Sequence, residues 1–210
     1  MNSESGTPVN ADDAKNARHA ARMARKKAVI DAAIAAADIE RGLLIVATGN
    51  GKGKSTSAFG TLARALGYGM KAGVCQFIKS RIDTGEEAFF GKQHGVEWHV
   101  LGDGFTWDTQ NREQDIATSK RGWEVAKRML GDASYQLLIL DELTYLLSYG
   151  YLDADDVLDA LANRAPMQHV IVTGRGASDA LKELADTVSV IADEKHAFRA
   201  GVKAQRGIDL

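Results

Sequence analysis

The chain has a single cysteine, Cys75, among 210 residues, which excludes an internal disulfide. Extracellular proteins form and keep disulfides, so the lone cysteine favours a reducing compartment, and we expect Cys75 to be a small buried apolar residue. No apolar run approaches the ~20 residues that a membrane-spanning helix needs. The N-terminus also lacks the apolar stretch of a secretory signal. We therefore expect a cytoplasmic protein that crosses no membrane.

An excess of charge of one sign is lacking too. Twenty-six Lys and Arg residues stand against 28 Asp and Glu residues, a net charge of -2, which argues against nucleic acid or an anionic membrane as the main partner. The nucleophile motif G-x-S-x-G is absent. The histidines show no metal-ligand spacing, so we expect structural or solvated roles for His19, His94, His99, His169 and His196.

Glycine, by contrast, is concentrated in one loop, T-G-N-G-K-G-K-S-T at residues 48–56. An apolar run precedes the loop and a stretch with helical spacing follows it, which is the strand–loop–helix context of a phosphate loop. Backbone N–H groups and the positive end of the helix dipole favour phosphate there. Lys54 supplies a cation for the phosphates, and Ser55 supplies a hydroxyl for Mg²⁺. The loop predicts binding of a nucleoside triphosphate.

The loop departs from two generic patterns. Thr48 stands where a generic phosphate loop has its first glycine, and the glycine comes one residue later at Gly49. The dinucleotide pattern G-x-G-x-x-G also fails, because Lys54 occupies its last glycine position. The alternative of a ligand-free glycine turn leaves the sequence Lys54-Ser55 without a structural use.

The rest of the chain alternates between strand and helix patterns. Several predicted strands are continuously apolar, as in parallel sheets that are covered on both faces. We expect strands at 43–48, 72–78, 96–101, 137–141, 170–173 and 188–191, and helices at 54–66, 86–93, 112–130, 154–163 and 177–185. The pattern predicts a single α/β domain over residues 41–210. Residues 1–40 are expected to form a disordered tail and a helical arm, which is alanine-rich and basic over Lys15–Asp38.

Ligands of parallel sheets bind at the carboxyl ends of the strands, so the loops there are the candidate site. Asp141 and Glu142 follow the fourth predicted strand and suit Mg²⁺, directly or through water, although acids there could also cap the next helix. The sequence does not choose between them as the direct ligand. Arg175, between two glycines after the fifth strand, suits a guanidinium aimed at phosphate or ribose.

Two further segments are candidates for ligand contact. Phe105 and Trp107 occupy alternate positions in a glycine-bounded loop after the third strand. Burial habits favour a loop Trp anchored in the core, but these rings could also wall a pocket for a broad, flat ligand. The basic C-terminal stretch 195–207 has the composition of an exposed tail, and it could alternatively close over an anionic substrate.

Taken together, these motifs resemble the phosphate-loop type of ATP:corrinoid adenosyltransferase, or cob(I)alamin adenosyltransferase. The resemblance runs from about Arg41 to the C-terminus, and Thr48 is also typical of that family. It is carried by T-G-N-G-K-G-K-S-T at 48–56, V-C-Q-F-I-K at 74–79, G-F-T-W-D-T-Q-N-R-E at 104–113, L-D-E-L-T-Y at 140–145, V-T-G-R-G at 172–176 and K-H-A-F-R-A-G-V-K-A-Q at 195–205.

The resemblance implies a P-loop NTPase-like, recombinase-like fold and transfer of the 5′-deoxyadenosyl group of ATP to reduced cobalt. It implies that ATP binds in the reverse sense, with its distal phosphate in the loop, and that Phe105 and Trp107 pack on the lower corrin face. Lys54, Arg175, Phe105 and Trp107 become the catalytic residues, with Mg²⁺ at Ser55 and Glu142. The implied ATP-binding set is Arg175 with Gly49, Asn50, Gly51, Lys52, Gly53, Lys54, Ser55 and Thr56. A homodimer and an electron donor such as a flavoprotein are also implied.

Two other functions share the phosphate loop. A recombinase-like motor would hydrolyse ATP to ADP on a macromolecule, and a small-molecule kinase would transfer the γ-phosphoryl group. The loop with Phe105 and Trp107, and the lack of an overall basic charge, favour the adenosyltransferase over the motor.

Overall fold

The computed structural model of the chain describes residues 11–78, 84–102 and 111–209. Six parallel strands form one sheet in the order β3-β2-β4-β5-β1-β6. The strands are β1 (Leu44–Thr48), β2 (Ala72–Gln76), β3 (Val96–Val100), β4 (Leu137–Asp141), β5 (His169–Thr173) and β6 (Thr187–Val190). The predicted α/β class and its parallel sheet are confirmed, and the strand boundaries differ from the predicted ones by a residue or two.

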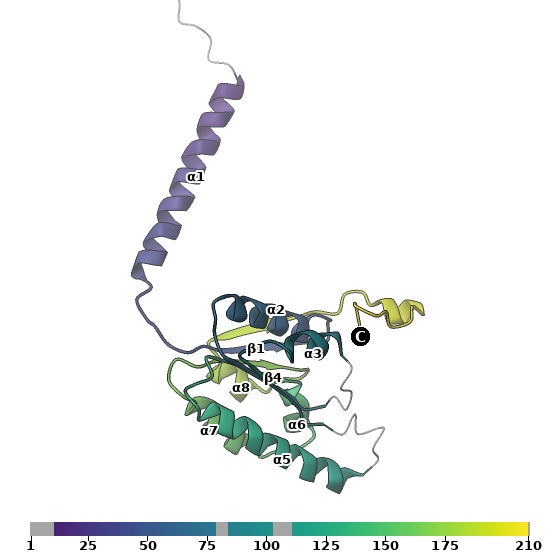
Figure 1. Ribbon diagram of the computed structural model, residues 1–210. Helices are drawn as coiled ribbons and strands as arrows, with labels where there is room; N and C mark the ends of the chain where they lie inside the picture. Colours follow the sequence, from purple (N-terminus) through teal and green to yellow (C-terminus); the bar gives the residue numbers. More distant parts are fainter. Residues whose placement is uncertain (1–10, 79–83, 103–110, 210) are drawn as a thin grey trace, which may run out of the picture. The chain divides into compact units, whose positions relative to one another are not determined.

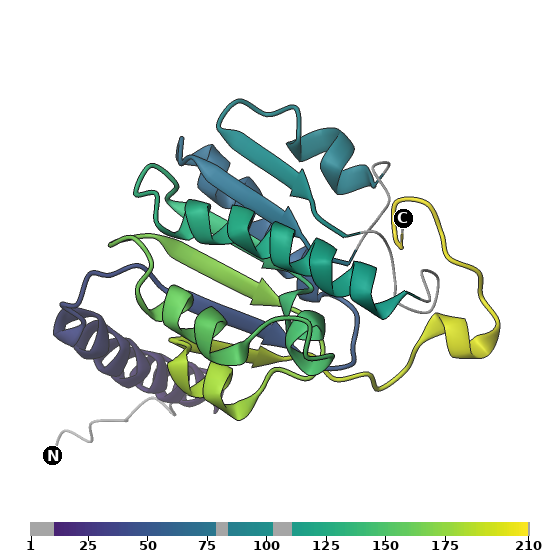
Figure 2. The same ribbon diagram turned by 90° about the horizontal axis from the view of Figure 1, so that it is seen from below.

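Helices cover both faces of the sheet (Figures 1 and 2). On one face Phe59 and Leu62 of α2 (Lys54–Gly67) and Phe90 of α3 (Gly85–Phe90) pack on strand residues such as Ile139. On the other face a larger apolar cluster joins the sheet to α5 (Arg112–Leu130), α6 (Leu143–Ser148), α7 (Ala154–Ala162) and α8 (Asp179–Leu184). The continuous apolar runs of β2 and β4 are therefore buried from both sides.

Cys75 lies in the centre of this core on β2 and is fully buried. Burial raises the pKa of its thiol to about 12, and nearby Glu97 adds to the increase. A thiol with so high a pKa stays protonated and unreactive, so Cys75 is the apolar core residue that the sequence predicts.

Two short elements were not predicted. The first is α6, which follows Asp141 and Glu142 directly. The second is a single 3-10 turn, η1 (Ala197–Ala200), in the basic C-terminal stretch, whose side chains are largely exposed. Both were missed because turns this short carry no apolar periodicity.

The chain falls into two compact units, residues 1–40 and 41–210. In the first unit α1 (Ala11–Ala36) begins with Asp12 and Asp13 in its first turn, where the helix dipole favours acids. Val29 and Ile34 are among its exposed apolar side chains. No helix in the described ranges is both long and apolar enough to cross a membrane.

Candidate active site

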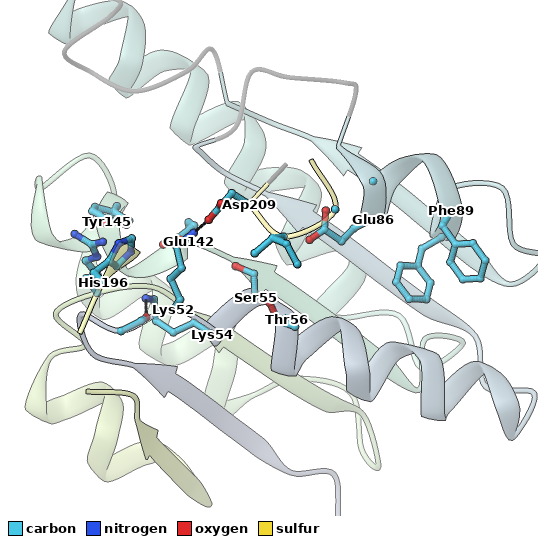
Figure 3. A pocket seen from close by; sticks show the side chains of 17 residues that line it. Lys52, Lys54, Ser55, Thr56, Glu86, Phe89, Glu142, Tyr145, His196 and Asp209 are labelled. Atoms are coloured by element: carbon cyan, nitrogen blue, oxygen red, sulfur yellow. Dashed lines mark hydrogen bonds and ion pairs between the residues drawn. The ribbon is translucent and has the colours of Figure 1, made fainter. Parts of the chain in front are cut away.

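Three adjacent strands, β4, β5 and β1, end at the same edge of the sheet and carry the three phosphate-site motifs. A pocket of about 690 Å³ opens there, which is within the usual range of ~300–1,000 Å³ for small-molecule sites. Its lining includes Lys54, Ser55, Glu142 and Arg175, so the structure brings together predicted residues from all three strand ends (Figure 3).

The segment that follows β6 packs against the phosphate loop and holds it through backbone contacts. Gly51 N–H donates to the Ile191 carbonyl at 2.8 Å, and Ile191 N–H donates to the Thr48 carbonyl at the same distance. A Cβ atom at Gly49 would lie 2.4 Å from the Ile191 oxygen, and one at Gly51 would lie 2.3 Å from the Ala192 oxygen. These glycines are needed because another backbone passes directly beneath the loop.

Thr48 has a specific structural role at the position of the generic first glycine. Its hydroxyl accepts a hydrogen bond from Ala177 N–H at 3.3 Å, and its side chain is almost fully buried. This bond ties the phosphate loop to the turn that carries Arg175. The threonine therefore couples two of the three strand ends.

Lys54 is 7% exposed, and its Nζ donates to the Gly51 carbonyl at 2.8 Å, across the loop. Burial lowers the pKa of Lys54 below its ordinary value; Glu142 opposes this effect and Arg175 adds to it. Because burial is the main cause, a phosphate group bound at Nζ would favour the charged form of Lys54 by replacing the lost solvation.

Asp141 and Glu142 point to different places. Asp141 is fully buried and accepts hydrogen bonds from Gln76 Nε2 at 3.1 Å and from the Thr173 hydroxyl at 2.8 Å. Glu142 lines the pocket and adopts the left-handed conformation, with φ at 62°. It stands at the start of α6 without any side-chain capping bond, so capping does not explain it.

The turn with Arg175 is shaped by glycines on both sides. Gly174 and Gly176 have φ values of 134° and 67°, and the Thr144 hydroxyl donates to the Arg175 carbonyl at 2.6 Å. The guanidinium side chain is exposed at the pocket, while its backbone is fixed. This arrangement suits a cation that reaches toward a phosphate group.

A magnesium site can be tested against these residues. No three His, Cys, Asp or Glu side chains of the described residues cluster as a metal cage. Mg²⁺ usually takes one or two protein ligands together with substrate phosphates and water, however. The Ser55 hydroxyl and the Glu142 carboxylate line one pocket beside the phosphate loop, so the donor set fits that pattern.

Several lining residues were not singled out from the sequence. They are Tyr145, His196, Glu86, Phe89 and Asp209. His196 was expected to be structural or solvated, yet it lines the pocket. Asp209 pairs with Lys52, so the C-terminal tail returns to the phosphate loop (Figure 3). Tyr145 and His196 lie within motifs that carry the family resemblance but had no chemical role assigned, whereas Glu86, Phe89 and Asp209 lie outside every motif. Phe105 and Trp107 lie outside the described residues.

Sequence comparisons identify the family. The family model described as ATP:corrinoid adenosyltransferase BtuR/CobO/CobP matches residues 40–210, and that described as cob(I)alamin adenosyltransferase N terminal matches residues 2–34. The chain belongs to the ATP:corrinoid adenosyltransferase family. ATP and a corrinoid are therefore the substrates that this site has to accommodate, and adenosyl transfer is the reaction.

Individual members of the family match along most of their length. The corrinoid adenosyltransferase of Pseudomonas aeruginosa is 54% identical over 96% of this chain and 100% of its own. Those of Escherichia coli K12 and Salmonella typhimurium are 54% and 51% identical, each over 91% of this chain and 97% of its own. A solved Pif1 helicase from Candida albicans matches with a TM-score of 0.28 and 14% identity over 79% of this chain and 38% of that chain, too weakly to bear on function.

Proposed function

We propose that this chain transfers the 5′-deoxyadenosyl group of ATP to the cobalt(I) of a corrinoid and releases inorganic triphosphate. One observation carries the proposal. The chain belongs to the adenosyltransferase family, and the lining of its pocket combines Lys54 of the phosphate loop with Glu142 and Arg175. The pocket holds cations for a polyanionic leaving group. The reaction needs no general base from the protein, because cobalt(I) is itself the nucleophile.

The reaction balances without a further reactant. The electron pair of cobalt(I) forms the cobalt–carbon bond to C5′, and the C5′–O bond breaks. The triphosphate leaves with the electron pair of that bond, and cobalt becomes formally cobalt(III). The protein has to place C5′ next to cobalt and to stabilise the charge that collects on the departing oxygen atoms.

Each residue of the phosphate loop has a proposed role in that task. ATP binds with its distal phosphate in the loop, so that C5′ lies far from Lys54. Lys54 and Arg175 neutralise the triphosphate, and loop N–H groups of residues 49–56, with the side chains of Asn50, Lys52 and Thr56, complete the cradle. The support is that Lys54 and Arg175 line one pocket and influence each other electrostatically.

Ser55 and Glu142 are the proposed Mg²⁺ ligands. Asp141 is not a proposed ligand; its buried carboxylate fixes the end of β4 through hydrogen bonds. Support comes from the burial of Asp141 under two hydrogen bonds and the place of Glu142 in the pocket lining. When bound, Mg²⁺ would neutralise part of the triphosphate charge.

The corrinoid side of the site is proposed from the family pattern. Phe105 and Trp107 would pack against the lower face of the corrin, displace the lower axial ligand and keep water away. Cobalt(II) without axial ligands is easier to reduce, which would make cobalt(I) accessible to an electron donor such as a flavoprotein. We also propose a cytoplasmic homodimer with a catalytic domain over residues 41–210 and an arm over residues 1–40.

One product analysis separates this function from phosphoryl transfer or ATP hydrolysis. Purified protein is supplied with ATP, Mg²⁺ and chemically reduced cobalamin, and the phosphate products are resolved by chromatography. We expect triphosphate in a one-to-one ratio with a new cobalt–carbon chromophore. ADP as the sole nucleotide product would rule the proposal out in favour of a kinase or motor.

A further inference from the structure

The segment after β6, which lies outside the three strand-end motifs, contributes His196 to the pocket lining. Residues after β6 pass beneath the phosphate loop through the two hydrogen bonds of Ile191, then turn toward the pocket. An ion pair between Arg199 and the mostly buried Asp193 holds this turn together. His196 lies between these two residues and is half-buried in the pocket lining.

The hydrogen bonding of His196 assigns the tautomer of its neutral ring. His196 is the N-cap of η1, and its Nδ1 accepts a hydrogen bond from Phe198 N–H at 3.2 Å. A nitrogen that accepts cannot carry a proton, so the neutral ring is protonated at Nε2. The ring therefore presents an N–H donor at the atom opposite the one that caps the turn.

The surroundings of His196 are those of an anion site. His196 and Tyr145 both line the pocket, and in the view of Figure 3 both lie at the end away from Phe89. Tyr145 is within electrostatic range of Glu142 and Arg175, and both of these lie within range of Lys54. His196, Lys54 and Arg175 line the same pocket, so a triphosphate held by the two cations is the oxyanion that the His196 N–H would meet.

We propose that His196 is a substrate-contacting residue of adenosyl transfer, whose Nε2–H donates to an oxygen of the triphosphate. This inference rests on the proposed function. As the C5′–O bond breaks and charge collects on the triphosphate, an N–H donor at Nε2 stabilises that charge together with Lys54 and Arg175. The two backbone hydrogen bonds of Ile191 to the phosphate loop would help to hold this donor near the phosphates.

Two substitutions separate the pocket contact from the capping role. His196→Asn keeps an acceptor at the position of Nδ1, because asparagine is a strong N-cap, and it removes the distant donor. His196→Gln has the reverse effect, since its amide N–H₂ reaches the position of Nε2 and its oxygen is too far out to cap. His169→Asn is the matched control: His169 Nδ1 also accepts a backbone bond, from Leu43 N–H at 3.1 Å, but it begins β5 at the other edge of the sheet.

The first readout is binding of inorganic tripolyphosphate and of ATP to the full chain, measured by calorimetry without corrinoid. We expect H196N to bind tripolyphosphate about tenfold more weakly, because a hydrogen bond to a charged group is lost. H196Q and H169N should stay within about threefold of wild type. The second readout is turnover, where we expect kcat of H196N to fall about 10- to 100-fold.

The opposite ranking would overturn the inference. Wild-type tripolyphosphate affinity in H196N, or equal losses in H196N and H196Q, would show that His196 acts only through the turn it caps. Failure of the proposed function looks different. In that case the wild-type chain makes no cobalt–carbon product, while the tripolyphosphate comparison still reports whether His196 meets phosphate.

Discussion

Thr173, at the end of β5, donates its hydroxyl hydrogen to the carboxylate of Asp141, at the end of β4, across a distance of 2.8 Å. The same hydroxyl oxygen accepts from Glu142 N–H at 2.9 Å. One side chain thus links two adjacent strand ends and sets the backbone from which Glu142 enters the pocket. The unusual left-handed conformation of Glu142 is fixed by this contact.

Removing this hydroxyl should weaken both the fold and the site. Thr173→Val keeps the shape of the side chain but leaves buried Asp141 and Glu142 N–H each short of one partner. We expect the free energy of unfolding in urea to fall by about 1–3 kcal/mol. Thr173→Ser keeps the hydroxyl and should lose less than half of that; equal losses would show that the methyl group, not the bond, matters.

The two acids at the end of β4 should respond differently to neutralisation. Glu142→Gln should reduce Mg²⁺-dependent ATP binding at least about tenfold, because a neutral amide is a poor ligand for Mg²⁺. Its stability should change by less than about 1 kcal/mol. Asp141→Asn should instead destabilise the fold by about 1–3 kcal/mol, since its amide N–H₂ would replace one of the two oxygen atoms that accept from Gln76 and Thr173. Magnesium titrations by calorimetry and urea unfolding together test this split, which the reverse ranking would contradict.

Lys54→Met should remove most of the charge stabilisation of the leaving triphosphate while it preserves the length of the side chain. We expect kcat to fall about 100-fold or more with chemically supplied cobalt(I). Lys182→Met is the control, because Lys182 pairs with Asp179 on α8 and is not part of the pocket lining. Near-normal turnover in Lys54→Met would argue against the phosphate assignment.

The same variant makes a pH prediction for the protein without nucleotide. Burial lowers the pKa of Lys54 in the folded state below the ordinary 10.5, so the unfolded chain binds the proton more tightly. Charged Lys54 therefore destabilises the fold below its folded pKa, and stability recovers as pH rises from that value to 10.5. We expect Lys54→Met to be more stable than wild type at pH 7, with a difference that shrinks above the folded pKa. Urea unfolding across pH measures the difference.

Trp107→Ala should impair the reaction far more when cobalt(II) has to be reduced in the assay than when cobalt(I) is supplied. The reason is that the proposed role of Trp107 is to exclude the lower axial ligand, which matters only for the reduction. In both assays the rate is measured from the appearance of the cobalt–carbon chromophore. Equal losses in both assays would indicate that Trp107 only maintains the fold.

Glu97 on the edge strand β3 gives a test of stability away from the pocket. Hydrogen bonds from Tyr135 and then His99 lower the pKa of Glu97 to about 2, against 4.5 unfolded. A depressed carboxylate pKa stabilises the fold above pH 4.5, and the gain is lost as pH falls from 4.5 to 2. Because Glu97 is about one-third exposed, we expect no more than about 1–2 kcal/mol. The stability difference between wild type and Glu97→Gln should disappear near pH 2, and turnover at pH 7 should stay unchanged.

The strand–loop–helix pattern and the apolar strands were readable from the sequence because they depend on neighbours along the chain. The glycines, Lys54 and Ser55 of the loop at 48–56 are adjacent in the sequence, so the loop could be recognised without knowledge of its neighbours in space. The continuous apolar residues of β2 and β4 likewise predict burial on both faces. Strand ends then predict a common edge, so Ser55, Glu142 and Arg175 could be placed in one site. Their roles in ATP and Mg²⁺ binding remain predictions.

Contacts between distant segments could not be read in the same way. Nothing in the sequence distinguishes Asp141 from Glu142; the difference arises because Thr173 and Gln76 on neighbouring strands bury the first and leave the second at the pocket. Because β6 pairs with β1, the segment after β6 contacts Gly51 of the phosphate loop. The same segment then supplies His196 and Asp209 to the pocket lining. Local sequence determined which residues could bind phosphate, and only the packing of the sheet decided which of them share one pocket.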